Sequence, residues 1–262
     1  MTGLGMTPVV RTLLIINIGV FIFQAFLQID VTYFFGLRNW NSPLFAPHQF
    51  VTYMFLHGGL GHIFGNMFAL FMFGPMLEYT LGTRRFLIFY MVAGIGAGVL
   101  NTAINGWELQ GQQNALAAYV KSPDPDGFVQ YMHRYEPMHY NGNAKFLEAF
   151  ADNPKDPAYL SESVKFATDL YKSHVNTPTV GASGAVFGLL IAFALLFPNI
   201  EMMLLFFPVP IKAKYFVTLY LLYEIFAGLG YSGPSNVAHF AHISGALVGF
   251  LLIKYWKIEK KY

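Results

Sequence analysis

The sequence predicts an all-α membrane protein: a bundle of six transmembrane helices with a soluble insert between the third and fourth helices. Apolar residues make up 55% of the 262 residues and charged residues only 11%, whereas soluble domains carry about 25% charged residues. Half of the 30 charged side chains lie in residues 105–178. The rest of the chain contains six long apolar runs, and a helix that spans a bilayer needs about 20 mainly apolar residues.

The expected spans cover residues 12–29, 60–80, 86–104, 181–199, 215–230 and 237–256. The first follows Arg11 and lacks a small-residue cleavage pattern, so we expect an uncleaved anchor rather than a signal peptide. The fifth contains an acid, Glu224. Residues 202–210 are apolar but short and interrupted by proline, so they are expected to lie at the membrane interface without crossing it.

The chain is expected to have three parts. Residues 1–104 hold helices one to three, residues 105–178 form an extracytoplasmic insert, and residues 179–262 hold helices four to six. Apolar residues recur at three and four positions within the insert, which predicts two or three short amphipathic helices there. Lysine and arginine in the short loops gather on one side of the spans, so both termini are expected in the cytoplasm of a bacterium, with the protein in its inner membrane.

Two classes of function are excluded or disfavoured by composition. The chain has no cysteine, which excludes disulfides, thiolate metal sites and thiol nucleophiles. Its formal net charge of +2 is too small to indicate a nucleic-acid partner.

Polar residues inside the spans gather at one depth. Polar groups in a membrane usually face the bundle interior or a water-filled cavity. Spans two, four and six run in the same direction, so their first turns lie at similar depth, and these turns contain His62, Asn66, Ser183, His239 and His242. His62 and Asn66 are four residues apart and share a helix face. Together these side chains could supply a nucleophile, a base and hydrogen-bond donors for acyl transfer.

No carboxylate lies near His242 in the sequence. The acids inside or beside the spans are Asp30, Glu78, Glu201 and Glu224, and the simplest catalytic interpretation is a dyad of Ser183 and His242 without an acid partner. His239 and His242 could together bind a metal, but no thiol or carboxylate joins them in sequence, so neither a metal nor a cofactor is expected.

Small residues form stripes on two of these helices. Gly184 and Gly188 are four apart on span four, and Ala241, Gly245 and Gly249 repeat at the same spacing on span six. Such stripes let membrane helices pack closely, and contact between these two would bring Ser183 beside His242. The pattern is also common where only packing is involved.

The sequence resembles the rhomboid intramembrane serine proteases at three motifs. GASGAVFG is similar to the G-x-S-G motif around the family's nucleophile, HISGALVG to its histidine motif, and HGGLGHIFGNM to its oxyanion helix. The resemblance implies that Ser183 is the nucleophile and His242 the general base, and that His62 and Asn66 bind the oxyanion. Gly181 and Gly184 belong to the serine motif.

Five further positions are interpreted through the same resemblance. Phe187 stands where the family often has a tyrosine against the catalytic ring, and His239 at a position that is not always histidine. His57 is expected to be structural. His48-Gln49 replaces the Trp-Arg pair common in the first loop, so that anchor is altered.

The expected function is therefore that of an endopeptidase that cuts transmembrane proteins near the outer membrane face, with lipid as its surroundings and transmembrane proteins as its partners. Two alternatives stay open. A catalytically silent rhomboid-like protein would bind membrane clients without cutting them. A histidine-lined transporter would need polar residues along the full length of several spans, whereas here they gather at one end.

Overall fold

The computed structural model of the chain describes residues 5–26, 30–136, 144–204, 207–231 and 237–259. The chain divides into two compact units. We call Met1–Leu37, Phe45–Ala103 and Pro178–Tyr262 the core unit, and Arg38–Leu44 and Ile104–Thr177 the insert unit.

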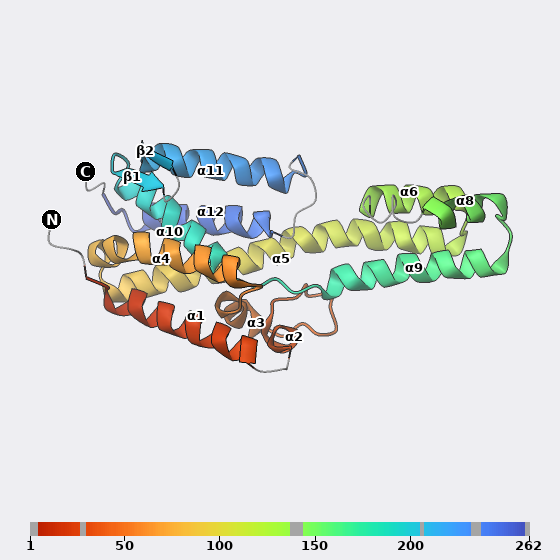
Figure 1. Ribbon diagram of the computed structural model, residues 1–262, viewed down its shortest axis with the longest axis horizontal. Helices are drawn as coiled ribbons and strands as arrows, with labels where there is room; N and C mark the ends of the chain where they lie inside the picture. The colour runs from red at the N-terminus through yellow and green to blue at the C-terminus, as the bar shows by residue number, and fades with distance from the viewer. Residues whose placement is uncertain (1–4, 27–29, 137–143, 205–206, 232–236, 260–262) are drawn as a thin grey trace. The chain divides into compact units, whose positions relative to one another are not determined.

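The core unit contains the expected helices and several shorter elements (Figure 1). In chain order these are α1 Pro8–Phe26, α2 Val31–Phe35, α3 Gln49–Thr52, the 3-10 helix η1 Tyr53–Phe55, α4 Leu60–Leu81, the first part of α5 Thr83–Lys121, α10 Ser183–Leu196, β1 Glu201–Leu204, β2 Phe207–Lys212, α11 Ala213–Gly228 and α12 His239–Tyr255.

Three helices of the described chain, α1, α4 and α5, are long and apolar enough to cross a membrane, and α10 and α12 are shorter apolar helices. A helix occurs at each of the six expected places, with ends that differ by a few residues except at the C-terminal end of α5. By length and composition, however, fewer than the six predicted helices of the described chain are able to cross a membrane.

Helix α5 is much longer than expected. The span was predicted to end at residue 104, but the helix continues to Lys121. Its last part is rich in glutamine, alanine and leucine, which favour helix, and the first proline after it is Pro123. The end of the apolar run marks where the side chains become polar and does not end the helix.

The all-α expectation fails between α10 and α11. There β1 and β2 pair antiparallel, with Glu201 opposite Lys212 and Met202 opposite Ile211. Pro208 and Pro210 lack the N–H that a helix interior needs. A ribbon of only two strands leaves one side of each strand unpaired, so it tolerates proline.

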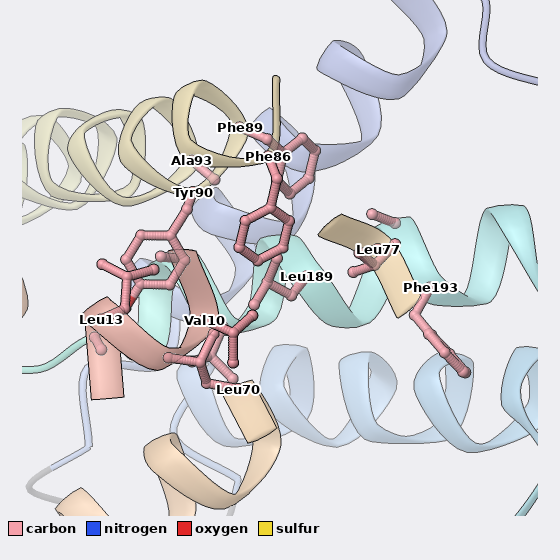
Figure 2. Packing of buried hydrophobic residues seen from close by; sticks show 14 of the residues in the cluster. Val10, Leu13, Leu70, Leu77, Phe86, Phe89, Tyr90, Ala93, Leu189 and Phe193 are labelled. Atoms are coloured by element: carbon pink, nitrogen blue, oxygen red, sulfur yellow. The ribbon is translucent and has the colours of Figure 1, made fainter. Parts of the chain in front are cut away.

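Large apolar side chains from four helices pack together in the core unit. Figure 2 shows Val10 and Leu13 of α1 near Leu70 of α4, Tyr90 of α5 and Leu189 of α10, all of them buried. Many other apolar side chains of α1, α4 and α11 are exposed, among them Phe23, Phe71 and Leu222. Exposed apolar surface of this extent suits contact with lipid.

A buried carboxylate holds the start of α1. Glu78 of α4 accepts hydrogen bonds from the backbone N–H groups of Val9 and Val10 at 3.0 to 3.1 Å. The first N–H groups of a helix have no partner within the helix and carry partial positive charge. Glu78 therefore neutralises the α1 N-terminus and ties it to α4.

The predicted glycine stripes meet, as expected. A Cβ on Gly245 would lie 2.0 Å from the carbonyl oxygen of Gly184, and one on Gly249 would lie 2.8 Å from the Cα of Gly188. A Cβ on Gly184 would lie 2.5 Å from Cβ of Ala97 in α5. The backbones of α10 and α12 are thus in direct contact.

The insert unit has a small core of its own. Its helices include α6 Pro125–Tyr135, α8 Ala144–Asp152 and α9 Pro157–Asn176, which confirms the expected amphipathic helices. Asp124 and Asp156 cap α6 and α9, each directly before a proline, an arrangement typical of helix starts. The core gathers aromatic and aliphatic side chains of these helices and of the end of α5: Leu116, Tyr119, Phe128, Tyr131, Met132, Phe150 and Ala167.

We predict that Gly245→Ala destabilises the protein, because the added methyl group would collide with the α10 backbone. Overpacking of this kind costs about 1–3 kcal/mol. Thermal unfolding in detergent should show a clear drop in Tm. Gly65→Ala in α4 is the matched control, since nothing lies within 4 Å of a Cβ there. Equal Tm values for the two variants would contradict the packing argument.

Candidate active site

Ser183 is the first residue of α10, and the chain before it is fixed by backbone hydrogen bonds. Leu37 and Thr179 exchange two such bonds, at 2.9 and 2.7 Å, and the Gly181 N–H donates to the Tyr53 carbonyl at 2.9 Å. Gly181 has a φ of 128°, a conformation that favours glycine. The serine hydroxyl therefore lies at a helix N-terminus, where backbone N–H groups and the helix dipole favour negative charge.

His242 of α12 contacts the serine. The Oγ of Ser183 lies 2.8 Å from the Nε2 of His242, within hydrogen-bond distance. The two residues are 59 positions apart in sequence, and the glycine contact between α10 and α12 brings their helices together.

A carboxylate lies on the other side of the His242 ring. Glu224 Oε2 is 2.9 Å from His242 Nδ1, so the expectation that His242 has no acid partner is wrong. An ionised carboxylate only accepts hydrogen bonds, so Nδ1 carries the proton and Nε2 is free to accept one from Ser183. This is the tautomer that a general base needs.

His239 binds the same carboxylate oxygen. Its Nδ1 lies 2.7 Å from Glu224 Oε2, and all three residues are buried. The carboxylate therefore receives two ring N–H groups, which offsets the cost of burying its charge.

The face of the His242 ring is covered by Phe187. The ring centroids are 4.2 Å apart and the planes differ by 10°. Tyr220 of α11 packs against Phe187 in turn, at 4.9 Å. Phe187 thus packs on the His242 ring, as expected at this position, and restricts the rotation of that ring.

His62 has a defined hydrogen-bonding role. Its Nδ1 accepts a hydrogen bond of 3.3 Å from the Gly58 N–H, so in the neutral ring Nε2 carries the proton. A Cβ on Gly181 would lie 2.6 Å from this Nε2 and 3.6 Å from Ser183 Oγ. Glycine at position 181 is therefore required by space as well as by φ, and the donor of His62 lies beside the serine.

Asn66 follows one turn later on α4. Its side-chain nitrogen is buried and has no hydrogen-bond partner among the described residues. A buried, unpaired donor costs free energy, and an anion that forms during a reaction could satisfy it.

His57 packs edge-on against His62, with ring centroids 5.1 Å apart. It lies in the segment between η1 and α4. Burial, and then the proximity of His62, lower the pKa of His57 from 6.5 to about 4. His57 is therefore neutral at physiological pH, consistent with the structural role expected for it.

The donor atoms of Glu224, His239 and His242 lie within 4.8 Å of one another, close enough for a metal site. Metal binding was disfavoured from the sequence because no carboxylate joined the histidines, and that reason is wrong. The distances of 2.7 and 2.9 Å to one oxygen are those of direct hydrogen bonds.

The contact of Glu224 with His242 is what the sequence did not predict, although a signal was present. An ionisable residue inside a span is a candidate functional residue by default. Glu224 lies near the end of the fifth expected span, and His239 and His242 lie at the start of the sixth. Consecutive antiparallel spans place these positions at similar depth, which the expectation of a dyad did not consider.

Comparison with known proteins agrees with the motifs. The family model of the Rhomboid domain matches residues 45–117 and 158–257. A mitochondrial rhomboid protein of Schizosaccharomyces pombe, named as uncharacterized, is 30% identical over 225 residues, which are 81% of this chain and 52% of that protein. RHOMBOID-like protein 12, mitochondrial, of Arabidopsis thaliana is 25% identical over 94% of this chain and 57% of its own length. A putative rhomboid protease of Bacillus subtilis is 40% identical over 47 residues, 18% of this chain and 24% of that protein.

The expected location in a bacterial inner membrane is wrong by this comparison, because the two relatives that match over most of the chain are named mitochondrial. The chain spans little more than half the length of these two relatives. Since the Rhomboid domain matches most of its residues, the chain belongs to the rhomboid family.

Proposed function

We propose that the protein is an intramembrane serine endopeptidase that cuts transmembrane protein substrates near one face of the bilayer. The observation that carries this proposal is the 2.8 Å contact between Ser183 Oγ and His242 Nε2. The unpaired donor of Asn66 and the position of His62 support it, because they supply what an oxyanion requires.

The reaction follows from these groups. His242 Nε2 takes the hydroxyl proton of Ser183 as Oγ attacks the peptide carbonyl carbon. The carbonyl oxygen becomes an anion that accepts hydrogen bonds from His62 and Asn66 and from the backbone N–H of Ser183. His242 then gives the proton to the leaving nitrogen, the C–N bond breaks, and an acyl-enzyme remains. Water then attacks the ester carbonyl carbon while His242 takes a proton from it. His242 returns this proton to Ser183 Oγ as the C–O bond to the serine breaks and the carboxylic acid product leaves.

We predict that Ser183→Ala and His242→Ala both abolish cleavage of a test transmembrane substrate and reaction with a fluorophosphonate probe. Each variant removes a group that forms or breaks a bond in the reaction. Ser244→Ala is the matched control: it removes another buried hydroxyl of the core unit, two residues from His242, and should react like the wild type. A wild-type protein that neither reacts nor cuts would contradict the protease proposal and favour a silent client-binding protein.

The oxyanion donors generate a second expectation. Loss of one donor typically costs about 2.7–4 kcal/mol in the transition state, so Asn66→Ala should lower kcat by roughly a hundredfold or more. KM should change little, because the anion forms only during the reaction. His62→Ala should behave in the same way. Normal turnover in both variants would assign these residues to packing.

We propose further that the chain forms six spans in a mitochondrial membrane and that residues 105–178 lie outside the bilayer. The relatives named mitochondrial support the location. Their names do not bear on the insert, for which the support is its content of charged side chains.

Single cysteines in this cysteine-free chain test both parts of that proposal. Lys155 of the insert unit and Ile22 of α1 are both exposed. In open membrane sheets prepared from mitochondria, Lys155→Cys should react with a maleimide that does not enter lipid, and Ile22→Cys should not. Absence of the chain from these membranes would contradict the location, and equal reaction of the two cysteines would contradict the exposed insert.

A further inference from the structure

We propose that Glu224 is a positioning residue that holds the His242 ring in its basic tautomer, and that His239 holds Glu224 in place. The inference rests on the proposed function of Ser183 and His242. It adds an acid and a second histidine to a pair that the sequence indicated would act alone.

The hydrogen bonds on the two nitrogens of the His242 ring differ in direction. The carboxylate of Glu224 lies 2.9 Å from Nδ1 of His242, and Ser183 Oγ lies 2.8 Å from Nε2 of the same ring. Neutral imidazole has one N–H donor and one acceptor. With Nδ1–H donated to the carboxylate, the lone pair of Nε2 points at the serine hydroxyl. Without the carboxylate, the ring could carry its proton on Nε2. Nε2 would then have no lone pair with which to accept the serine proton.

The proposed reaction places a positive charge on the His242 ring. When His242 takes the serine proton, it becomes an imidazolium inside a mainly apolar bundle. A buried cation without a partner is costly, and a carboxylate in hydrogen-bond contact offsets that cost. Glu224 is therefore placed to stabilise the positive charge that forms on His242 during the reaction. It can do so without contacting the substrate.

The Glu224 carboxylate is itself held by His239. A carboxylate on α11 has several rotamers, and it must keep one of them to direct the His242 ring. His239 donates Nδ1–H to the same Oε2 at 2.7 Å, and it lies one helical turn before His242 on α12. The two rings lie on one face of α12 and both contact Oε2 of Glu224. These two contacts link α11 to α12 at the depth of Ser183.

The positioning role can be measured without any activity. The chain has eight histidines, so selective 15N-histidine labelling yields a tractable NMR spectrum in detergent, and His242→Asn identifies the His242 signals. We expect wild-type His242 to carry its proton on Nδ1. In Glu224→Gln, whose amide can donate as well as accept, that protonation pattern should change. A wild-type His242 protonated on Nε2, or an unchanged pattern in Glu224→Gln, would overturn the proposal.

Kinetics provide the second measurement. Loss of the acid from a serine–histidine–aspartate triad, with geometry intact, lowers kcat by about 10⁴, so Glu224→Gln should lower kcat by at least a hundredfold and leave KM almost unchanged. Glu78→Gln is the matched control, because Glu78 is also a buried carboxylate in the core unit but contacts the start of α1. It should lower Tm and not kcat.

His239 is tested through a double-mutant cycle. His239→Phe should lower kcat less than Glu224→Gln, since His242 keeps its own contact with the carboxylate. In the Glu224→Gln background His239→Phe should have no further effect on kcat, because it acts through Glu224. Additive effects would overturn the assigned role of His239.

A replacement variant and two further results separate the positioning role of Glu224 from a failure to fold, from an inactive protein and from a metal site. If Glu224→Gln does not fold, Glu224→Asp replaces it: the shorter side chain keeps the charge but withdraws it from Nδ1, so kcat should still fall. A wild-type protein with Nδ1-protonated His242 that nevertheless does not cut contradicts the protease proposal and supports the positioning contact. Activity that is lost with a chelator and restored by Zn²⁺ would overturn the proposal in favour of a metal bound by Glu224, His239 and His242.

Discussion

The backbone contact between α10 and α12 is the constraint on which the site depends. Ser183 and His242 come from different helices, and their hydrogen bond of 2.8 Å is too short-ranged to tolerate a change in helix spacing. Gly245 and Gly184 remove the side chains that would separate the helices. Because lipid supplies no hydrophobic force between helices, close packing of this kind must hold them together. Gly184, in the motif around Ser183, thus supports the contact of Ser183 with His242 by allowing α10 and α12 to pack closely.

A second constraint follows from placing polar groups in an apolar bundle. Each buried donor or acceptor needs a partner, or it raises the free energy of the fold. Glu224, His239, His242 and Ser183 meet this requirement by bonding to one another in a chain. The Asn66 side-chain nitrogen does not meet it within the described residues. The same bundle therefore contains a satisfied network around the His242 ring and an unsatisfied donor on Asn66, which would suit the proposed oxyanion.

The sequence predicted what depends on composition and local spacing. Apolar runs marked the positions of the helices, and the repeats of small residues on two of them predicted the contact of α10 with α12. Glu224 was missed because α11 is apolar around most of its surface, so no polar face indicates which side turns toward α12. The β1–β2 ribbon and the extension of α5 were missed for another reason. Hydropathy indicates whether a segment lies in lipid or in water, whereas its backbone conformation depends on proline content and helix propensity.

The neutral state of His57 also bears on His62, the proposed oxyanion donor. His57 lies against His62, and its pKa is lowered to about 4 by burial and by that neighbour. A neutral His57 therefore places no positive charge beside His62. His62, with Nδ1 occupied by the Gly58 N–H, then presents Nε2–H as a neutral donor. A neutral donor binds an anion that forms during a reaction without attracting a permanent counterion beforehand. The proposed base, His242, is thus ordered by the negative charge of Glu224, whereas the proposed oxyanion donors, His62 and Asn66, are neutral groups.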